Sequence, residues 1–281
     1  MERNIGIFGG DDRYCYLAND LILRGNKVWV WELGSERSAC PLLSEYEKVE
    51  AVKSFSELAR VCQVLVGPVP FSKYLKEKKE FGDSICKALQ PGQYFYAGGI
   101  PKELADTLKN SGVKVTDFLK EESFLKKNAE LTAQGLVAEV MCAWKKRIKG
   151  AKVLVTGFGF CGREIAGIMR GVGADVTVCV RRMQSAWEAY EAGFSIGYYE
   201  QLDGLLPGMD IVINTVPAMV IPEDRLRHAR EKTLFVEIAS APGGFSTELA
   251  ESLGMMVLLC PGLPGKYAPE GAALAMAECI V

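Results

Sequence analysis

Residues 152–162 have the sequence KVLVTGFGFCG, in which an apolar strand is followed at once by the pattern G-x-G-x-x-G. In a dinucleotide-binding turn, the first glycine permits the sharp bend, the second lets the backbone approach a pyrophosphate, and the third allows close packing of helix on strand. Residues 163–172 continue as an amphipathic helix, whose first N–H groups and positive dipole end suit phosphate groups. The segment predicts a dinucleotide site, and the alternative is a turn of purely structural value. The residues expected at the cofactor in this turn are Gly157, Phe158, Gly159, Phe160, Cys161 and Gly162.

The end of the next strand distinguishes NAD from NADP. An NAD site usually carries Asp or Glu about 20 residues after the glycines, where the carboxylate holds the ribose 2′-hydroxyl. Here the strand expected after the helix leads into Arg181 and Arg182, and its acid, Asp175, lies at the opposite end. Guanidinium groups bind phosphate through paired, charge-assisted hydrogen bonds. The sequence therefore favours NADP, with the two arginines at its 2′-phosphate, and two solvated surface arginines are the alternative.

Short apolar runs alternate with amphipathic stretches along the chain of 281 residues. This pattern is typical of α/β proteins with parallel sheets, and the length predicts two domains. We expect two doubly wound, Rossmann-like parallel sheets joined by a long interdomain helix. Strands are expected at 5–8, 28–31, 49–52, 64–69, 94–97 and 113–118, and again at 152–156, 176–180, 210–215, 234–238 and 256–260.

The domain organisation follows from the segment between the two sets of strands. Residues 128–147 carry apolar side chains at helical spacing without a proline, so they predict the linking helix, which Gly150 would end. We expect a substrate domain at 1–127, the interdomain helix at 128–148 and an NADP-binding domain at 149–267, with a cleft between the domains. The Ala-rich tail at 268–281 predicts a further helix, which we expect on the first domain; packing on the second is the alternative.

Three loops rich in Gly and Pro follow strands of the second half, at residues 214–217, 239–244 and 260–265. Ligands of open parallel sheets bind at the carboxyl ends of the strands. We therefore expect Thr215, Val216, Pro217 and Ala239 to contact the cofactor, although a simple tight turn is the alternative for each loop.

The first domain opens with a related but incomplete turn, GGDDR at residues 9–13, which lacks the third glycine. One interpretation is a small-anion site, where helix N–H groups and Arg13 face a substrate carboxylate. The other is a close-packed turn in which an aspartate caps the helix. The sequence leaves both open.

Composition excludes several classes of protein. Lys and Arg total 33 and Asp and Glu total 35, so the net charge of −2 gives no basic footprint for nucleic acid or an anionic membrane. The nine cysteines include no C-x-x-C pair and the chain has one histidine, so we expect buried, reduced thiols and no metal site. No apolar stretch has the length of a membrane span and no signal peptide is evident, so we expect a cytoplasmic protein.

The chain resembles the family of dipicolinate synthase A subunits of spore-forming bacteria, whose two-domain plan is similar to that of formate and glycerate dehydrogenases. The order and spacing of several segments carry the resemblance, rather than any one of them. Gln134 and Ala241 depart from the family pattern, in which a carboxylate and a basic residue are expected. The similar segments are 9–11, Asn128 with Thr132 and Gly135, 155–162, 210–217 with Met219, 239–240 with 242–244, and 261–265 with 268–269.

The resemblance implies NADP-dependent oxidation of a dihydrodipicolinate-level precursor, derived from hydroxytetrahydrodipicolinate, to pyridine-2,6-dicarboxylate (dipicolinate) during sporulation. It also implies a partner, the flavoprotein-like B subunit of dipicolinate synthase, while homo-oligomerisation stays open. On this basis we expect polar groups to hold the two substrate carboxylates, and no catalytic acid or base is assigned. The candidate substrate-binding residues are Asp11, Arg13, Asn128, Thr132, Ser240 and Lys266.

The single histidine bears on the type of reaction. Alcohol dehydrogenases commonly use a histidine base, and His228 lies in the charged stretch RLRHAR, where we expect a surface position. Oxidation of a ring towards aromaticity depends less on such a base, because positioning the ring against the nicotinamide supplies much of the catalysis. The alternatives are another NADP-dependent two-domain dehydrogenase, of the hydroxy-acid or shikimate type, and a non-catalytic NADP-sensing module.

Overall fold

The computed structural model describes residues 2–33 and 49–280. The chain divides into two compact units: the first is Met1–Asn128 with Ala268–Val281, and the second is Ala129–Tyr267. Helix α6 (Glu122–Ala143) contains the boundary between them. The first unit is therefore discontinuous in sequence, and the second is a single continuous stretch.

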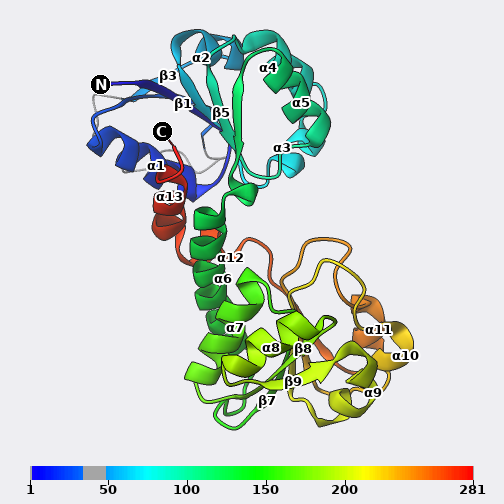
Figure 1. The fold of residues 1–281 in the computed structure, drawn as a ribbon. Helices are drawn as coiled ribbons and strands as arrows, with labels where there is room; N and C mark the ends of the chain where they lie inside the picture. Colours follow the sequence, from blue (N-terminus) through cyan, green and yellow to red (C-terminus); the bar gives the residue numbers. More distant parts are fainter. Residues whose placement is uncertain (1, 34–48, 281) are drawn as a thin grey trace. The chain divides into compact units, whose positions relative to one another are not determined.

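The first unit is built on a six-stranded sheet in the order β3-β2-β1-β4-β5-β6 (Figure 1). Every neighbouring pair is parallel. The chain order reverses between β1 and β4, as in doubly wound folds. The strands are β1 (Asn4–Phe8), β2 (Lys27–Trp31), β3 (Val49–Ala51), β4 (Val64–Val66), β5 (Tyr94–Ala97) and β6 (Lys114–Asp117). The helices are α1 (Asp12–Leu23), α2 (Phe55–Val61), α3 (Phe71–Glu77), α4 (Phe81–Ala88), α5 (Lys102–Asn110) and α13 (Pro269–Ala277).

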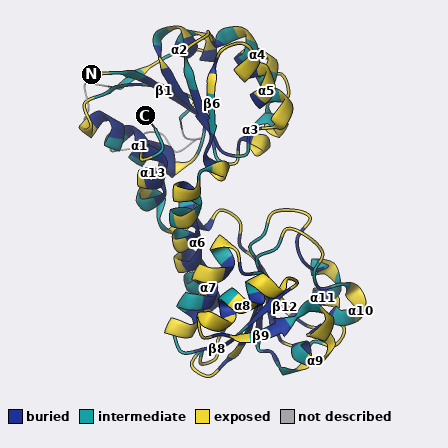
Figure 2. Ribbon diagram, viewed as in Figure 1, coloured by how far each residue is buried: buried dark blue, intermediate teal, exposed yellow. Residues whose placement is uncertain are grey.

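Both faces of this sheet are covered, which explains why its strands are continuous apolar runs. Ile5 and Ile7 of β1 belong to one buried cluster, and Phe8 belongs to another on the opposite face. The C-terminal helix α13 supplies Met276 to the same cluster as Leu17 of α1. Figure 2 shows the strands as mostly buried between partly exposed helices.

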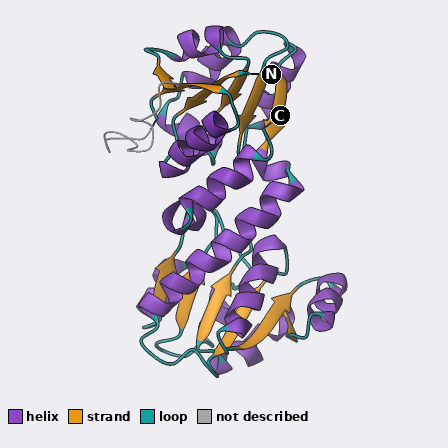
Figure 3. Cartoon of the chain, turned by 90° about the vertical axis from the view of Figure 1, so that its left-hand side faces the viewer, coloured by secondary structure: helices purple, strands orange, loops and turns teal. Residues whose placement is uncertain are grey.

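The second unit repeats the arrangement with the order β12-β11-β10-β7-β8-β9, again all parallel. Its switch point lies between β7 and β10. Figure 3 shows helices on both sides of each sheet, so the predicted fold class is confirmed. The strands are β7 (Lys152–Thr156), β8 (Asp175–Val180), β9 (Ser195–Tyr198), β10 (Ile211–Asn214), β11 (Leu234–Glu237) and β12 (Met256–Leu259). The helices are α7 (Phe160–Gly171), α8 (Met183–Glu191), α9 (Leu202–Leu205), α10 (Glu223–Leu226), α11 (Thr247–Ser252) and α12 (Leu263–Tyr267).

Several boundaries differ from those expected. Helix α6 begins at Glu122 and ends at Ala143, earlier at both ends than the predicted 128–148. Its buried face already starts at Phe124, and the chain leaves the helix at the buried Trp144. The strand predicted at 64–69 ends at Val66, since the prolines that follow lack the N–H of a ladder hydrogen bond.

The cysteines are only partly as expected. Those within the described residues are free thiols, and Cys15, Cys62, Cys179 and Cys260 are buried. Cys142, on α6, is exposed instead, and three others are half-buried. Cys40 lies outside the described residues. No helix in the described ranges is both long enough and apolar enough to cross a bilayer.

Candidate functional site

The glycine-rich turn between β7 and α7 is closed at its first and third glycines. Gly157 has a φ of +85°, a conformation that L side chains rarely adopt, and a Cβ there would lie 2.7 Å from Val216 Cγ2. A Cβ on Gly162 would lie 2.4 Å from the carbonyl oxygen of Gly157. At either position, any residue other than glycine would require these neighbouring atoms to move.

The middle glycine is open. A Cβ on Gly159 would meet no heavy atom within 4 Å. Gly159 is also the N-cap residue of α7, and no side chain caps the helix there. The backbone at the start of α7 therefore has open space where a side chain would stand, which leaves room for a pyrophosphate to approach the first N–H groups of the helix. The residues of this turn thus fit a bound dinucleotide.

The other residues of the turn have different surroundings. Phe158 is buried and packs edge-on against Phe194, with the Arg163 guanidinium 4.6 Å from its ring centre, so its backbone alone is left for a ligand. Phe160 is partly exposed at the start of α7. Burial raises the pKa of the Cys161 thiol, which keeps this sulfur protonated at neutral pH.

Arg181 and Arg182 directly follow β8, at the carboxyl edge of the sheet. Both are exposed, and Arg182 is the N-cap residue of α8. Strand β8 pairs with β7, and the Gly157 N–H donates to the Cys179 carbonyl at 2.8 Å, so the arginines follow a strand that is bonded directly to the turn. Asp175 begins β8 at the opposite edge.

Three polar side chains lie side by side at the ends of three neighbouring strands of this unit. Thr156 ends β7, Asn214 ends β10 and Glu237 ends β11, and they are register partners across the sheet. All three are buried, the first two completely and Glu237 with 8% exposure. Thr156 Oγ1 donates to Asn214 Oδ1 at 2.6 Å, and Asn214 Nδ2 donates to Glu237 Oε1 at 2.7 Å.

This row of side chains also holds the loop after β10. The Val216 N–H donates to Asn214 Oδ1 at 3.2 Å, and Asn214 Nδ2 donates to the Val216 carbonyl at 2.9 Å. Thr215 Oγ1 donates to the Thr156 carbonyl at 2.6 Å. Two of the predicted cofactor contacts are therefore fastened beside the glycine-rich turn, while Pro217 is exposed beyond them.

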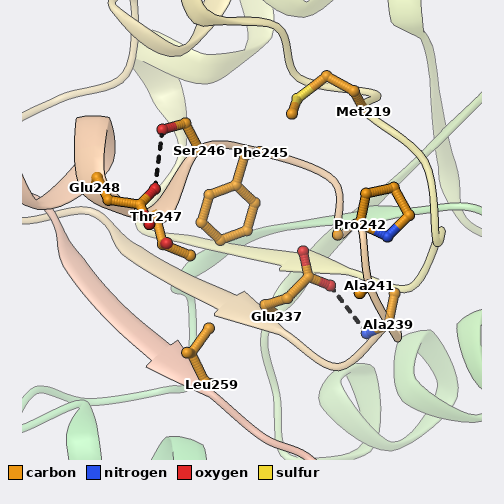
Figure 4. A pocket seen from close by; sticks show the side chains of 11 residues that line it. Met219, Glu237, Ala239, Ala241, Pro242, Phe245, Ser246, Thr247, Glu248 and Leu259 are labelled. Carbon is orange, nitrogen blue, oxygen red and sulfur yellow. Dashed lines mark hydrogen bonds between the residues drawn. The ribbon is translucent and has the colours of Figure 1, made fainter.

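The loop after β11 is held by Glu237. Its Oε1 accepts the Ala239 N–H at 2.9 Å, and its Oε2 accepts the Gly244 N–H at 2.7 Å. Beside this loop lies a hollow of about 360 Å³. Figure 4 shows the carboxylate between the Phe245 ring and the Ala239–Pro242 loop. The hollow is lined by Met219, Glu237, Ala239, Ala241, Pro242, Gly243, Phe245, Ser246, Thr247, Glu248 and Leu259.

The hollow and the arginines lie on opposite sides of the switch point. The hollow includes residues that end β11 and β12, beyond β10, whereas Arg181 follows β8, beyond β7. A dinucleotide that crosses the switch point would have its adenosine half near β8 and its nicotinamide half towards the hollow.

The turn in the first unit has the contacts expected of a capped turn. The Asp11 side chain is the N-cap of α1, and it also accepts from Arg13 Nε and Nη2, both at 2.7 Å. Arg13 Nη2 donates further to the Val69 carbonyl at 2.8 Å. A Cβ on Gly10 would lie 2.2 Å from the Tyr14 ring. These contacts favour a close-packed, capped turn over an open anion site.

The other substrate candidates are distributed over both units. Asn128 is the last residue of the first stretch of unit one, and Thr132 is buried on the part of α6 that belongs to the second unit. Ser240 is exposed in the loop that Glu237 holds. Lys266 forms an ion pair with Glu139, whose hydrogen bond raises the pKa of the lysine. His228 is exposed, as predicted, between α10 and β11.

Sequence reasoning gave Thr156 and Glu237 no role in the site, and it included Asn214 only as the first residue of a loop expected at the cofactor. A signal was present, because each of the runs KVLVT, IVIN and LFVE ends in one polar residue after buried apolar ones. Their contact depends on strand register, which one sequence does not give.

Two doubly wound sheets, one with a glycine-rich turn open at its middle glycine, define the class of two-domain dinucleotide-binding proteins. Comparison with known proteins is more specific. Residues 4–119 match the N-terminal domain of the dipicolinate synthase A subunit. Residues 123–253 match the NAD-binding domain of D-isomer specific 2-hydroxyacid dehydrogenases.

Individual relatives agree with these matches. The dipicolinate synthase A subunit of Bacillus subtilis (strain 168) is 33% identical over 153 residues, 54% of this chain and 52% of that protein, so the match spans about half of the relative's length. The crystal structure of the corresponding protein from Bacillus halodurans has a TM-score of 0.83 at 22% identity, covering 99% of this chain and 96% of that one. The Bacillus subtilis structure has a TM-score of 0.83 at 21% identity, covering 99% and 94%.

The comparisons confirm the resemblance to the A subunit of dipicolinate synthase. Together with the dehydrogenase match, they support an oxidoreductase role and an NAD(P)-binding second unit. The Bacillus subtilis relative is one lettered subunit of its synthase, and its name therefore implies that it has a partner.

Proposed function

We propose that this chain is the NADP-dependent oxidoreductase subunit of a dipicolinate synthase. It would oxidise a dihydrodipicolinate-level precursor, derived from hydroxytetrahydrodipicolinate, to pyridine-2,6-dicarboxylate in sporulation. The observation that carries the proposal is the open space at Gly159, before an uncapped helix and beside a strand that is followed by two exposed arginines. The likeness to the dipicolinate synthase A subunit supports the choice of substrate.

NADP is the proposed cofactor. The first N–H groups of α7 would hold its pyrophosphate, and Arg181 with Arg182 would hold its 2′-phosphate. The loops that begin at Thr215 and Ala239 would border its nicotinamide half. No acid follows β8 to bind an unmodified ribose hydroxyl, since this strand leads directly into the arginines.

When bound, NADP supplies a hydride acceptor at its nicotinamide, and the substrate ring loses one hydride and one proton to become aromatic. The chain's own residues would orient the ring and hold its carboxylates. Ser240 is well placed for this, because it is exposed between two residues that line the hollow. Lys266 carries the charge that a carboxylate requires, although it already contacts Glu139, and Asn128 and Thr132 are the other proposed contacts. Asp11 and Arg13 are bound to each other, so we expect them to stabilise the first turn rather than hold the substrate.

Formation of NADPH tests this function directly. The chain would be mixed with NADP and hydroxytetrahydrodipicolinate made enzymatically, with and without the flavoprotein-like B subunit that we propose as its partner. We expect the near-ultraviolet absorbance of NADPH to rise and dipicolinate to accumulate. If neither product forms when both proteins are present, the proposed function is wrong.

A second candidate is a 2-hydroxyacid dehydrogenase, which the match over residues 123–253 favours. The exposed position of His228, on the segment that leads into the amino end of β11, disfavours a histidine base for such a reaction. Turnover of a panel of 2-hydroxy acids, without formation of dipicolinate from the ring substrate, would favour this candidate.

A further inference from the structure

The row of polar residues at the ends of β7, β10 and β11 is more than a set of satisfied buried groups. It fastens the loop after β10 at Val216 and the loop after β11 at Ala239 and Gly244. At its other end, Thr156 directly precedes the glycine-rich turn. One continuous chain of hydrogen bonds therefore connects the proposed pyrophosphate site with the loops beside the hollow.

The two loops are also joined to each other next to this row. The N–H groups of Val220 and Ile221 both donate to the Gly244 carbonyl, at 3.0 and 2.9 Å. A Cβ on Gly244 would lie 2.3 Å from Asn214 Cγ, so the backbone of the loop packs against the row with no room for a side chain between them. The two loops, residues 215–221 and 239–244, are thus bonded to each other and to the row, and together they form a wall whose position depends on the row.

Glu237 is the member of the row that a neutral side chain cannot replace. Its carboxylate accepts three N–H groups, from Asn214, Ala239 and Gly244. A glutamine in its place has one acceptor oxygen and one N–H₂ group, so at least one of these donors would face another donor. An unsatisfied buried donor is unfavourable enough to move the loop.

We propose that Glu237 is a positioning residue for the nicotinamide half of the dinucleotide. Acting through Asn214 and Thr156, it holds the wall formed by the loops at 215–221 and 239–244 in fixed relation to the glycine-rich turn. This inference rests on the proposed dinucleotide binding and adds to it the residue that sets the geometry of the nicotinamide side.

The test compares two ligands on the full chain by calorimetric titration: NADPH, and 2′,5′-ADP, which represents the adenosine half alone. For Glu237→Gln we expect NADPH to bind about tenfold more weakly or worse, while the affinity for 2′,5′-ADP changes less than about twofold. Glu237→Asp keeps a carboxylate and should recover part of the NADPH affinity. Glu251→Gln, at an exposed glutamate of α11 that does not line the hollow, is the matched control and should change neither affinity.

A second variant guards against a folding defect. Thr156→Val removes the hydroxyl that donates to Asn214 Oδ1 at the far end of the row. Asn214 Oδ1 still accepts the Val216 N–H, so no buried acceptor is left without a partner. We expect this variant also to weaken NADPH binding selectively, by a smaller factor than Glu237→Gln. If Glu237→Gln does not fold, the result with Thr156→Val tests the positioning role by itself. Equal loss of both ligands, or loss of neither, would overturn the positioning role alone. If the unaltered chain binds neither ligand, dinucleotide binding itself is wrong, and the inference with it.

Discussion

The carbonyl oxygen of Gly157 occupies the space that a side chain on Gly162 would need, with only 2.4 Å to an added Cβ. At Gly159, between them in the same turn, an added Cβ would meet no heavy atom of the surrounding chain within 4 Å. One short segment therefore contains a glycine required by the protein's own packing and a glycine whose empty side is available to a ligand. Substitutions at the two should separate stability from binding.

Gly162→Ala should destabilise the second unit. The added methyl group meets backbone rather than a flexible side chain, and overpacking of this kind costs about 1–3 kcal/mol. The free energy of unfolding, measured with denaturant, checks the prediction. Gly167→Ala, in the same helix and with no atom within 4 Å of the new Cβ, is the control and should be neutral or slightly stabilising.

Gly159→Ala should leave stability nearly unchanged and weaken dinucleotide binding. Its methyl group would enter the space through which a pyrophosphate approaches the first N–H groups of α7, so we expect a loss of about tenfold or more in NADPH affinity. Calorimetric titration beside thermal unfolding measures both quantities. Unchanged affinity would show that no ligand lies against this glycine.

Replacing Arg181 and Arg182 together with alanine should change cofactor preference. Charge-assisted hydrogen bonds to a 2′-phosphate are worth enough that NADP affinity should fall roughly 10- to 100-fold, while NAD affinity stays nearly constant. Arg227→Ala, another exposed arginine of the second unit, provides the control. A parallel loss for both cofactors would argue against contact with the 2′-phosphate.

Arg13→Ala separates the two interpretations of the first turn. Because the guanidinium already binds Asp11 and the Val69 carbonyl, we expect a less stable first unit with little change in the KM for the ring substrate. Thermal unfolding and steady-state kinetics with the same preparation measure this. A large rise in KM with unchanged stability would instead establish the substrate-carboxylate role.

The thiols should react in the order of their exposure. Cys142 is exposed, whereas burial raises the pKa values of Cys62, Cys179 and Cys260 to about 12. Since the thiolate is the reactive form, a thiol reagent at neutral pH should modify Cys142 first and leave those three intact in the folded protein. Peptide mapping by mass spectrometry identifies the modified sites. Raising the pH to about 9 should not make the buried three reactive, because their pKa values remain well above it.

The ion pair between Lys266 and Glu139 should contribute at neutral pH and disappear in acid. Its hydrogen bond lowers the pKa of Glu139 below the ordinary value of 4.5, so the folded state favours the ionised carboxylate. That contribution is present above the unfolded pKa and is lost as the pH falls through the folded one. The difference in Tm between the unaltered chain and Lys266→Met should therefore be small at neutral pH and vanish at low pH. If the difference in Tm persists at low pH, the packing of the Lys266 side chain, rather than the ion pair, is its cause.

Much of the fold was predictable because its signals are local. The spacing of Gly157 and Gly162 predicts the turn. Apolar runs such as residues 152–156 are typical of the buried strands of a doubly wound sheet. Strand β9 was missed because Ser195 and Gly197 give it little apolar character, and its place beside β8 is a tertiary effect.

The parts of the site that lie within one segment of the sequence were predictable. The parts formed by contacts between separate segments were not. The turns at Gly10 and Gly159 look alike in sequence, yet the first is closed by the Tyr14 ring and the second is open. Glu237 reads as an ordinary strand-end acid until the register sets it beside Asn214. Distances between separate strands are the information that a single sequence lacks.

The return of the chain to the first unit has a consequence for biosynthesis. The second unit, Ala129–Tyr267, is continuous and can complete its sheet as soon as its own residues have left the ribosome. The first unit is synthesised earlier, but its core needs Met276 and Ala273 of α13. The first unit, although it is translated first, therefore completes its core only after the second unit and α13 have been translated.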